Sequence, residues 1–290
     1  MRDYFITTDS TTDLPDSYYQ ENQLELMYLS YTVDGITYEG EHQLDVHEFY
    51  DKMRAGSLPT TAQVNPETAK DTFQKIIRNT DADILHIAFS SGLSGSYNSV
   101  RIAAEELMEK DPEHRIIVID SLCASLGEGL LLHKAIQLKK NGATLDETAN
   151  WVEENKLHLV HNFTVDDLYN LYRGGRVSKT AAILGTMVNI KPILHVDNEG
   201  HLVPVSKVRG RKKSLLTLID SMERQMGSYR SQNDIVFISH GDCKEEAEFV
   251  ASQVKERFGI DQFIIHSVGP TIGTHSGPGT MALFYLGEYR

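Results

Sequence analysis

The chain has 290 residues, of which 40% are hydrophobic and 24% charged, so we expect a folded protein with a sizeable core. Its formal net charge of −13 argues against a general nucleic-acid binder and against adhesion to anionic membranes, because both need a basic surface. No apolar run approaches the ~20 residues of a membrane helix, and residues 1–10 show no secretory signal. With two cysteines far apart in the sequence, a reducing cytoplasm is the expected compartment.

Short apolar runs alternate with helical stretches along the first half of the chain. Strands are predicted at residues 5–8, 26–33, 84–89 and 115–119, and helices at residues 45–54, 66–80, 100–110, 127–140 and 144–155. A turn is predicted at Asp34-Gly35, and Asn141-Gly142 is typical of a helix end. Because the strands are solidly apolar, this alternation predicts a parallel sheet covered by helices on both faces.

The second half of the chain predicts a mixed α/β sheet. Strands are predicted at residues 192–196, 201–208, 235–239 and 263–268, and helices at residues 166–172, 180–188, 212–226 and 244–258. We expect residues 197–200 to join the first two of these strands as a hairpin. A domain boundary is placed near residues 157–165. The expected architecture is therefore an N-terminal α/β domain, residues 1–160, followed by a C-terminal α/β domain, residues 161–290.

A serine- and glycine-rich loop at residues 90–97 follows an apolar strand and precedes a helix. Glycines let the backbone approach a ligand, and the following helix N-terminus favours an anion such as a carboxylate or a phosphate. The loop matches neither the Walker A pattern nor G-x-G-x-x-G, and Gly-Leu-Ser-Gly is one residue short of the G-x-S-x-G elbow. Anion binding is the favoured interpretation, with a nucleophilic serine and a plain turn as alternatives. The candidate residues are Ser91, Ser94, Gly92 and Gly95.

Several other strands also end in small polar residues. Asp9-Ser10 follows the first strand, Asp120-Ser121 follows the fourth, and Ser239-His240 follows a later one. Ligands of open α/β sheets bind outside the carboxyl ends of the strands, so these tips are expected to converge on one cleft. Asp9 and Ser10 are candidates for lining it. The alternative is that Asp13 caps a helix in which an early proline is tolerated.

Two further loops contain candidate polar groups. Thr60 and Thr61 either cap the helix that begins at Pro66 or form a second wall of hydroxyl donors. His275 lies before Gly-Pro-Gly, which fixes a sharp backbone path, so it either contacts an anionic group, transfers protons or is structural. The remaining histidines and the cysteines show no ligand spacing, and we expect neither a metal nor a cofactor.

Basic residues gather at two places in this acidic chain. Arg173-Gly-Gly-Arg176 either grips an anion or is a glycine helix cap with solvated arginines. The second cluster, around residues 207–213, either docks a partner or phosphate group or is an ordinary charged corner. The candidates for partner or phosphate contact are Arg173, Arg176, Lys207, Arg209 and Arg211.

Together these motifs resemble the DegV family of bacterial fatty-acid-binding proteins, which includes the acyl-carrying subunits of fatty acid kinase. The resemblance runs from residue 3 to the C-terminus, and its strength lies in the order and spacing of individually weak motifs. The matching residues are Thr8-Asp9-Ser10-Thr11, Asp13-Leu14, Pro59-Thr60-Thr61, residues 90–97, Arg173-Gly174-Gly175-Arg176, residues 189–194, Lys207-Val208-Arg209, His275 and Gly277-Pro278-Gly279.

The resemblance implies a two-domain α/β carrier of one long-chain, palmitate-like fatty acid. It places the carboxylate at Thr61, at Ser91 or its neighbour Ser94, and at His275, with Thr60 adjacent. In kinase systems of this family, a separate ATP-dependent subunit phosphorylates the bound fatty acid for phospholipid synthesis, so this chain would be a non-catalytic subunit. From their apolar character near the arginine motif, we infer that an acyl tunnel is lined by Ile183, Leu184, Met187 and Phe163, and the alternative is that these residues belong to the core.

A carboxylate held by neutral hydroxyls and helix amides, without a buried lysine or arginine, is the expected head-group chemistry. The first alternative is a hydrolase or acyl transferase with Ser91 or Ser94 as nucleophile and His275 as base. The second is a sugar- or nucleotide-phosphate binder, which predicts no hydrophobic tunnel.

Overall fold

The computed structural model describes residues 2–178 and 189–290. It is a mixed α/β structure with three sheets, and the predicted fold class is confirmed. The helix predicted over residues 180–188 lies outside the described residues. So do Ile183, Leu184 and Met187, three of the four residues expected to line a tunnel.

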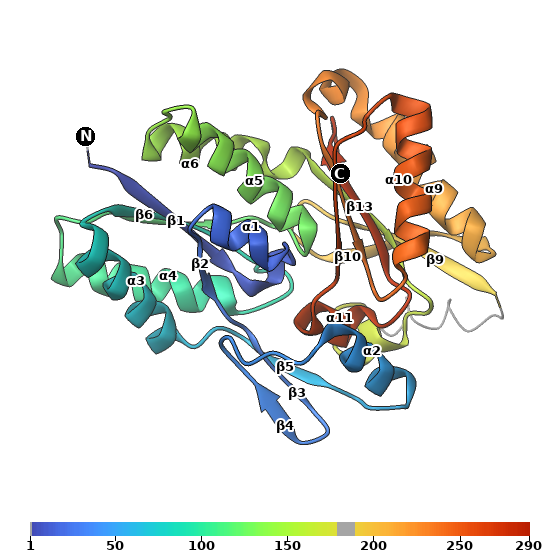
Figure 1. Ribbon diagram of the computed structural model, residues 1–290, viewed down its shortest axis with the longest axis horizontal. Coiled ribbons are helices and arrows are strands. Elements are labelled where there is room, and N and C mark those ends of the chain that lie inside the picture. Colours follow the sequence, from blue (N-terminus) through green and yellow to red (C-terminus); the bar gives the residue numbers. More distant parts are fainter. Residues whose placement is uncertain (1, 179–188) are drawn as a thin grey trace.

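The first sheet is parallel, with the strand order β2-β1-β6-β7 (Figure 1). Its strands are β1 (Tyr4–Asp9), β2 (Glu25–Met27), β6 (Asp83–Ala88) and β7 (Ile116–Asp120). The neighbouring helices are α3 (Pro66–Thr80), α4 (Ser96–Lys110), α5 (Leu126–Lys140) and α6 (Leu145–Asn155). Helices α3 and α4 cover one face and α5 and α6 the other, which buries all of β6 and confirms the predicted parallel sheet.

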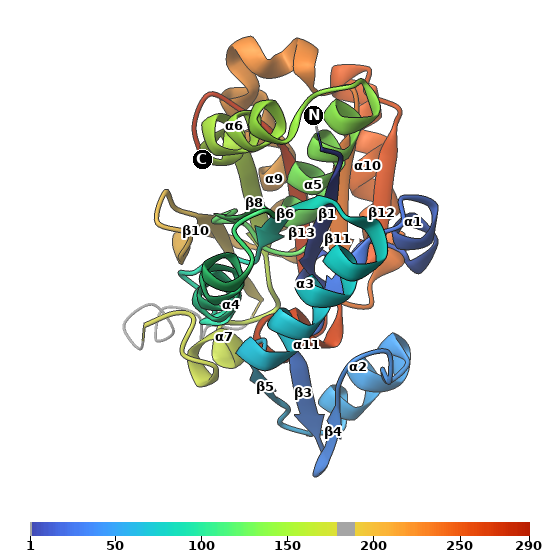
Figure 2. The same ribbon diagram turned by 90° about the vertical axis from the view of Figure 1, so that its left-hand side faces the viewer.

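A small antiparallel sheet, β4-β3-β5, projects from the rest of the molecule (Figures 1 and 2). Its elements are β3 (Ser30–Val33), β4 (Ile36–Tyr38), α2 (Val46–Arg54) and β5 (Thr60–Ala62), and we call residues 30–62 the arm. The single strand predicted over residues 26–33 is wrong: β2 and β3 belong to different sheets. The chain leaves the parallel sheet after Met27, and the Leu29 amide donates to Ser10 Oγ at 3.2 Å.

The third sheet has six strands in the order β10-β9-β8-β13-β11-β12 and is mixed. Its strands are β8 (Leu159–Thr164), β9 (Ile190–Val196), β10 (Leu202–Arg209), β11 (Val236–His240), β12 (Phe263–Ser267) and β13 (Met281–Leu286). Helices α9 (Arg211–Met226) and α10 (Lys244–Phe258) pack on it. The hairpin predicted at residues 197–200 joins β9 and β10. Strands β4, β5, β8 and β13 were not predicted.

Shorter helices complete the described chain: α1 (Asp16–Glu21), α7 (Tyr169–Arg173), α11 (Pro270–Ser276) and the 3₁₀ turns Ser10–Thr12, Lys156–His158 and Gly227–Gln232. Helix α5 packs against strands of both large sheets and is apolar on most sides, so a single core cluster spans the two. The division at residue 160 stays a prediction.

Candidate functional site

A cavity of about 390 Å³ lies where the arm, the serine loop, α11 and the six-stranded sheet meet. This volume falls in the range of small-molecule sites. Most of its wall is apolar, and Phe163, which we expected to line a tunnel, is part of it. The apolar lining residues are Leu29, Ala62, Phe89, Leu93, Ala124, Phe163, Leu171, Val196, Leu202, Val268, Ile272, Ala282 and Phe284.

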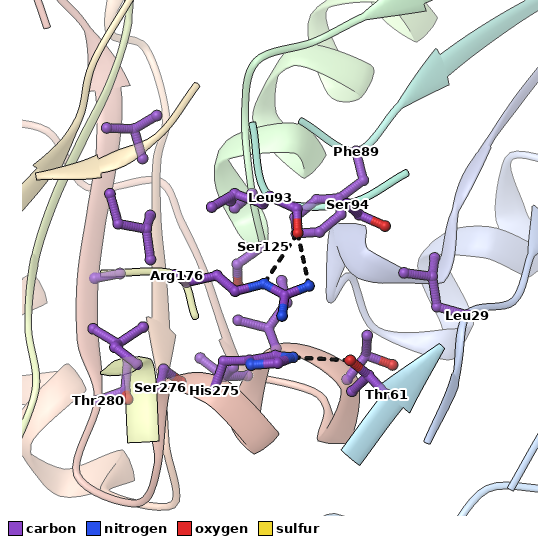
Figure 3. Close-up of a pocket in the computed structure, with 18 of the residues that line it drawn as sticks. Leu29, Thr61, Phe89, Leu93, Ser94, Ser125, Arg176, His275, Ser276 and Thr280 are labelled. Carbon is purple, nitrogen blue, oxygen red and sulfur yellow. Dashed lines mark hydrogen bonds between the residues drawn. The ribbon is translucent and has the colours of Figure 1, made fainter. Parts of the chain in front are cut away.

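Polar side chains gather at one side of this cavity, and Figure 3 shows how they converge. Thr61 Oγ1, from β5 in the arm, lies 2.8 Å from His275 Nε2 on α11. Ser94 of the serine loop and Arg176 after α7 line the same space. Thr61 and Ser94 supply hydroxyls, and His275 orients one of them, so the cluster suits a small anionic head group.

Strand geometry decides which of the two threonines reaches the cavity. Thr61 pairs with Tyr31 of β3, and its side chain turns towards α11. Successive side chains of a strand point to opposite faces, so Thr60 points away; it is exposed and does not line the cavity. Neither threonine caps the helix at Pro66, because Asn65 does, accepting from the Glu67 amide. Thr60 is therefore not a head-group candidate in this structure.

His275 is held as a neutral imidazole. Burial lowers its pKa to about 3, and the nearby positive charges of Arg176 and Arg173 act in the same direction. Its ring lies against Gly174, where a Cβ atom would come within 2.0 Å of Nδ1. A neutral ring with Nε2 facing Thr61 can fix the direction of the threonine hydroxyl but does not carry a charge to the ligand.

The serine loop contributes only part of what its sequence suggested. Ser94 and Gly95 line the cavity. Ser91 is exposed and does not line it, because the loop turns outward there and the Ser91 amide donates to Asp120 Oδ1 at 3.1 Å. Gly92 instead allows close packing on the β9–β10 hairpin: a Cβ atom there would meet the Gly200 backbone at 2.8 Å. The arrangement favours Ser94 over Ser91 as a ligand contact.

In the described residues, neither Ser91 nor Ser94 has the geometry of a serine nucleophile. Ser94 Oγ lies 3.0 Å from Ser96 Oγ and accepts from the Ser96 amide. The Nε2 atom of His275 is bonded to Thr61 instead. A serine nucleophile needs a base within hydrogen-bond reach, and His275 is hydrogen-bonded to neither Ser91 nor Ser94.

Asp9 and Ser10 do not line the cavity, which corrects the expectation for the strand tips. Both are turned inward, where they hold the backbone of residues that do line it. Asp9 Oδ2 accepts from the Phe89 amide at 2.8 Å, and Ser10 Oγ accepts from the Leu29 amide. Their contribution to the cavity is therefore indirect, through the positions of Phe89 and Leu29.

Asp13 does not cap helix α1, because Pro15 is the residue that precedes that helix and no side chain caps it. Its carboxylate accepts from Ser125 Oγ at 2.5 Å and from the Gly269 amide at 3.0 Å. Burial raises the pKa of Asp13 to about 7, against the effect of these two hydrogen bonds. Asp13 thereby connects the loop after β1 to the start of α5 and to the segment that leads into α11.

We expected a head-group site without a buried arginine, and the position of Arg176 contradicts this expectation. It lines the cavity, with Nε and Nη2 donating to the Leu93 carbonyl at 3.1 and 2.9 Å. Burial lowers the pKa of its guanidinium. Arg173 binds the carbonyls of Pro59 and Thr274. Both arginines join segments around the cavity, and Arg176 adds positive potential beside His275.

The second basic cluster lies away from the cavity. Lys207 and Arg209 are exposed on β10, an edge strand of the sheet. Arg211 begins α9 and pairs with Glu246 at 2.6 Å. None of the three lines the cavity, so any role in partner contact would be exercised at the surface.

Sequence reasoning missed several lining residues. Ser125 is the clearest, because its φ of 54° is unusual for a residue other than glycine and only the folded backbone reveals it. Ser276 and Thr280, beside the recognised histidine motif, also line the cavity. Within residues 2–178 and 189–290, no group of three or more His, Cys, Asp or Glu side chains could hold a metal ion. In the same part of the chain, no helix has the length and apolarity to cross a membrane.

The chain is similar to known proteins both in sequence and in fold. The chain matches the model of one family, described as uncharacterised protein, DegV family, over residues 4–288. A DegV domain-containing protein of Clostridium perfringens is 42% identical over 100% of this chain and 99% of its own length.

Two solved structures are similar over almost the whole chain. DegV of Bacillus subtilis, described as a fatty acid binding protein, has a TM-score of 0.85 at 28% identity and covers 99% of this chain and 100% of its own. A DegV family protein from Thermus thermophilus, described by its fatty acid binding, has a TM-score of 0.87 at 26% identity and the same coverage. The resemblance seen in the sequence motifs is confirmed, and this chain belongs to the DegV family.

Proposed function

We propose that this protein binds one long-chain fatty acid, with the carboxylate at Thr61, Ser94 and His275 and the acyl chain along the apolar wall. The observation that carries the proposal is the cavity itself, mostly apolar with Thr61, Ser94 and His275 grouped at one place in its wall. The relatives from Bacillus subtilis and Thermus thermophilus, both described as binding fatty acids, support the same ligand class.

The acyl chain supplies the affinity. Burying hydrocarbon is favourable by roughly 0.8 kcal/mol per CH₂ group, so a long chain offsets the cost of removing a carboxylate from water. That cost falls further if donors replace the lost water. Thr61 can donate its hydroxyl proton to the carboxylate while its oxygen accepts from Nε2–H of neutral His275, and Ser94 offers a second hydroxyl.

Arg176 supports the carboxylate from a distance. Its nitrogen atoms are bonded to the Leu93 and Gly174 carbonyls, so its fork is already engaged by the protein. The guanidinium nevertheless places positive charge in a partly buried region, where charge acts more strongly than in water. An anionic head group beside His275 is stabilised by that potential without a direct ion pair.

We further propose that a partner kinase, which supplies ATP, phosphorylates the bound carboxylate in the cytoplasm for phospholipid synthesis. In that reaction a carboxylate oxygen would attack the terminal phosphorus of ATP, an acyl phosphate would form and ADP would leave. This part depends on the family resemblance. Exposed Lys207 and Arg209 offer a basic docking surface on a chain of net charge −13, which suits an acidic partner or phosphate.

The test of ligand class is mass spectrometry of the lipid extracted from the purified protein, followed by titration with stearic acid. Thr61→Ala and Ser94→Ala should each weaken binding by about tenfold to a hundredfold, the value of one hydrogen bond to a charged group. The neighbours Thr60→Ala and Ser91→Ala are matched controls, because both side chains point away from the cavity. No bound lipid and no stearate binding would refute the proposal.

A further inference from the structure

Ser276 has a hydroxyl that the fold leaves without a partner. The residue ends α11, is 7% exposed and lines the cavity. Among the described residues, its Oγ atom has no hydrogen-bond partner. A buried polar group without a partner costs free energy, so such a group in a binding cavity needs an explanation.

Other polar side chains in the same cavity find partners within the protein. Ser125 Oγ lies 2.5 Å from Asp13 and 2.7 Å from Ser239 Oγ. His161 accepts the Ala124 amide at Nε2, which leaves Nδ1–H to donate to the Leu159 carbonyl. Thr280 Oγ1 donates to the Gly277 carbonyl at 2.7 Å. Among the described residues, His275 Nδ1, which lies against Gly174, is the other buried polar atom of this wall without a partner, so Ser276 has the buried hydroxyl that departs from the pattern.

The position of Ser276 separates it from the head-group cluster. Figure 3 shows the His275 ring extending towards Thr61, while Ser276 lies on the other side of that ring, near Thr280. Phe163, Ala282 and Phe284 line the same cavity, and a plain hydrocarbon chain against this wall cannot satisfy a hydroxyl. Alanine would serve a purely hydrocarbon ligand better at this place.

We propose that the cavity accepts an acyl chain that carries a hydroxyl group, with Ser276 as the residue that recognises it. This inference depends on the proposed fatty-acid binding. A ligand hydroxyl is both donor and acceptor. It can accept the Ser276 proton while it donates to a lone pair of Thr280, whose own proton is engaged by Gly277.

Serine suits this task because one side-chain torsion redirects its oxygen, so Ser276 can turn to a ligand without movement of α11. The predicted consequence is selectivity among fatty acids of equal length. The hydroxylated acid should lose no affinity through desolvation of its hydroxyl, since Ser276 restores the hydrogen bond lost from water.

The experiment compares stearic acid with a series of hydroxystearic acids that differ in the carbon bearing the hydroxyl, by titration of delipidated protein. For at least one member, the ratio of hydroxystearate to stearate affinity should fall about fivefold in Ser276→Ala. Ser276→Thr keeps the hydroxyl and should retain most of the selectivity. Ser214→Ala, at a fully buried serine of α9 bonded to the Arg211 carbonyl, is the matched control and should leave the ratio unchanged.

The outcomes separate this inference from the proposed function. If stearate does not bind, the proposed function has failed. If stearate binds and no hydroxystearate loses affinity specifically in Ser276→Ala, the inference is overturned. Equal weakening of stearate and all hydroxystearates would assign Ser276 to the carboxylate instead, which also overturns it. Thermal unfolding of each variant establishes that it is folded.

Discussion

The arm and the parallel sheet both place residues in the cavity, but they are held there in different ways. The serine loop extends from β6, which is buried along its whole length, and Asp9 secures Phe89 in front of that loop. The arm has a small core of its own, around Tyr31 and Phe49, and packs against α11.

Few side-chain bonds connect the arm to the remainder of the molecule. Tyr50 donates to the Val268 carbonyl at 2.9 Å, and Thr61 meets His275. Arg54 and His47 both bond to Asp242, and Arg173 donates to the Pro59 carbonyl. The two hydroxyls of the head-group site therefore have separate supports. Ser94 depends on the continuous core of the parallel sheet, whereas Thr61 depends on the arm and its contacts with α11.

The largest expected effect comes from Phe49→Ala, which empties the core of the arm. Phe49 is fully buried and packs edge-on against Tyr31 and Tyr50. Truncating such a ring costs about 3–5 kcal/mol. Amide hydrogen exchange should accelerate in β3, β4 and β5 while the β6 amides stay protected. Equal acceleration in β6 would contradict a separate support for the arm. Phe73→Ala, at a fully buried ring of α3, should show the converse pattern, with faster exchange in β6 than in the arm.

We predict that the free energy of unfolding depends on pH through Asp13, which lies at the junction between the parallel sheet and α11. Its pKa is raised in the folded protein to about 7, so the folded state holds a proton that the unfolded chain loses near its ordinary pKa of about 4. Stability should therefore be highest at the acidic end of this window and decrease as the pH rises from about 4 to about 7, by up to about 4 kcal/mol.

The check on Asp13 is chemical denaturation of the protein and of Asp13→Asn across that pH range. The asparagine amide cannot ionise, so Asp13→Asn should lack this pH dependence. The unfolding free energy of the unmodified protein minus that of Asp13→Asn should therefore decrease as the pH rises and level off above about 7. A difference independent of pH would show that Asp13 is already ionised in the folded protein throughout.

Gly174→Ala tests the α11 side of the head-group site. An added Cβ atom would come within 2.0 Å of His275 Nδ1, so the ring must leave the position in which Nε2 meets Thr61. We expect about a tenfold loss of stearate affinity, or about 1.4 kcal/mol, measured by titration. Gly142→Ala has open space around its Cβ position and is a control remote from the cavity, although its positive φ makes it mildly strained. Unchanged affinity in Gly174→Ala would argue against a role for the His275 position.

The smallest effect is expected for Asp242→Asn, at the ion pairs that attach the arm. His47 and Arg54 both bond to this carboxylate, and both are partly exposed. Exposed ion pairs contribute about 0.2–1 kcal/mol and weaken with salt. Hydrogen exchange of the arm should accelerate slightly at low salt, and the difference from the unmodified protein should shrink at high salt. A difference insensitive to salt would contradict an electrostatic attachment.

Local patterns in the sequence were sufficient for much of the secondary structure. Helices α3 and α10 begin and end where their periodicity predicts, and the turn at Asp34-Gly35 and the β9–β10 hairpin are present. Apolar period, caps and turn residues act over a few neighbouring positions, so one sequence reveals them. The motifs that resemble the DegV family were likewise readable, because their order along the chain is itself sequence information.

Only the tertiary structure decided which of those motifs meet. Thr61 and His275 are 214 positions apart, and their 2.8 Å contact depends on how β5 and α11 pack. The same packing turned Ser91 and Thr60 outward, placed Arg176 at the cavity and brought Ser125 and Ser276 to its wall. Sequence patterns record local geometry, whereas the cavity is formed by contacts between distant segments, and those are set by the burial of the whole core.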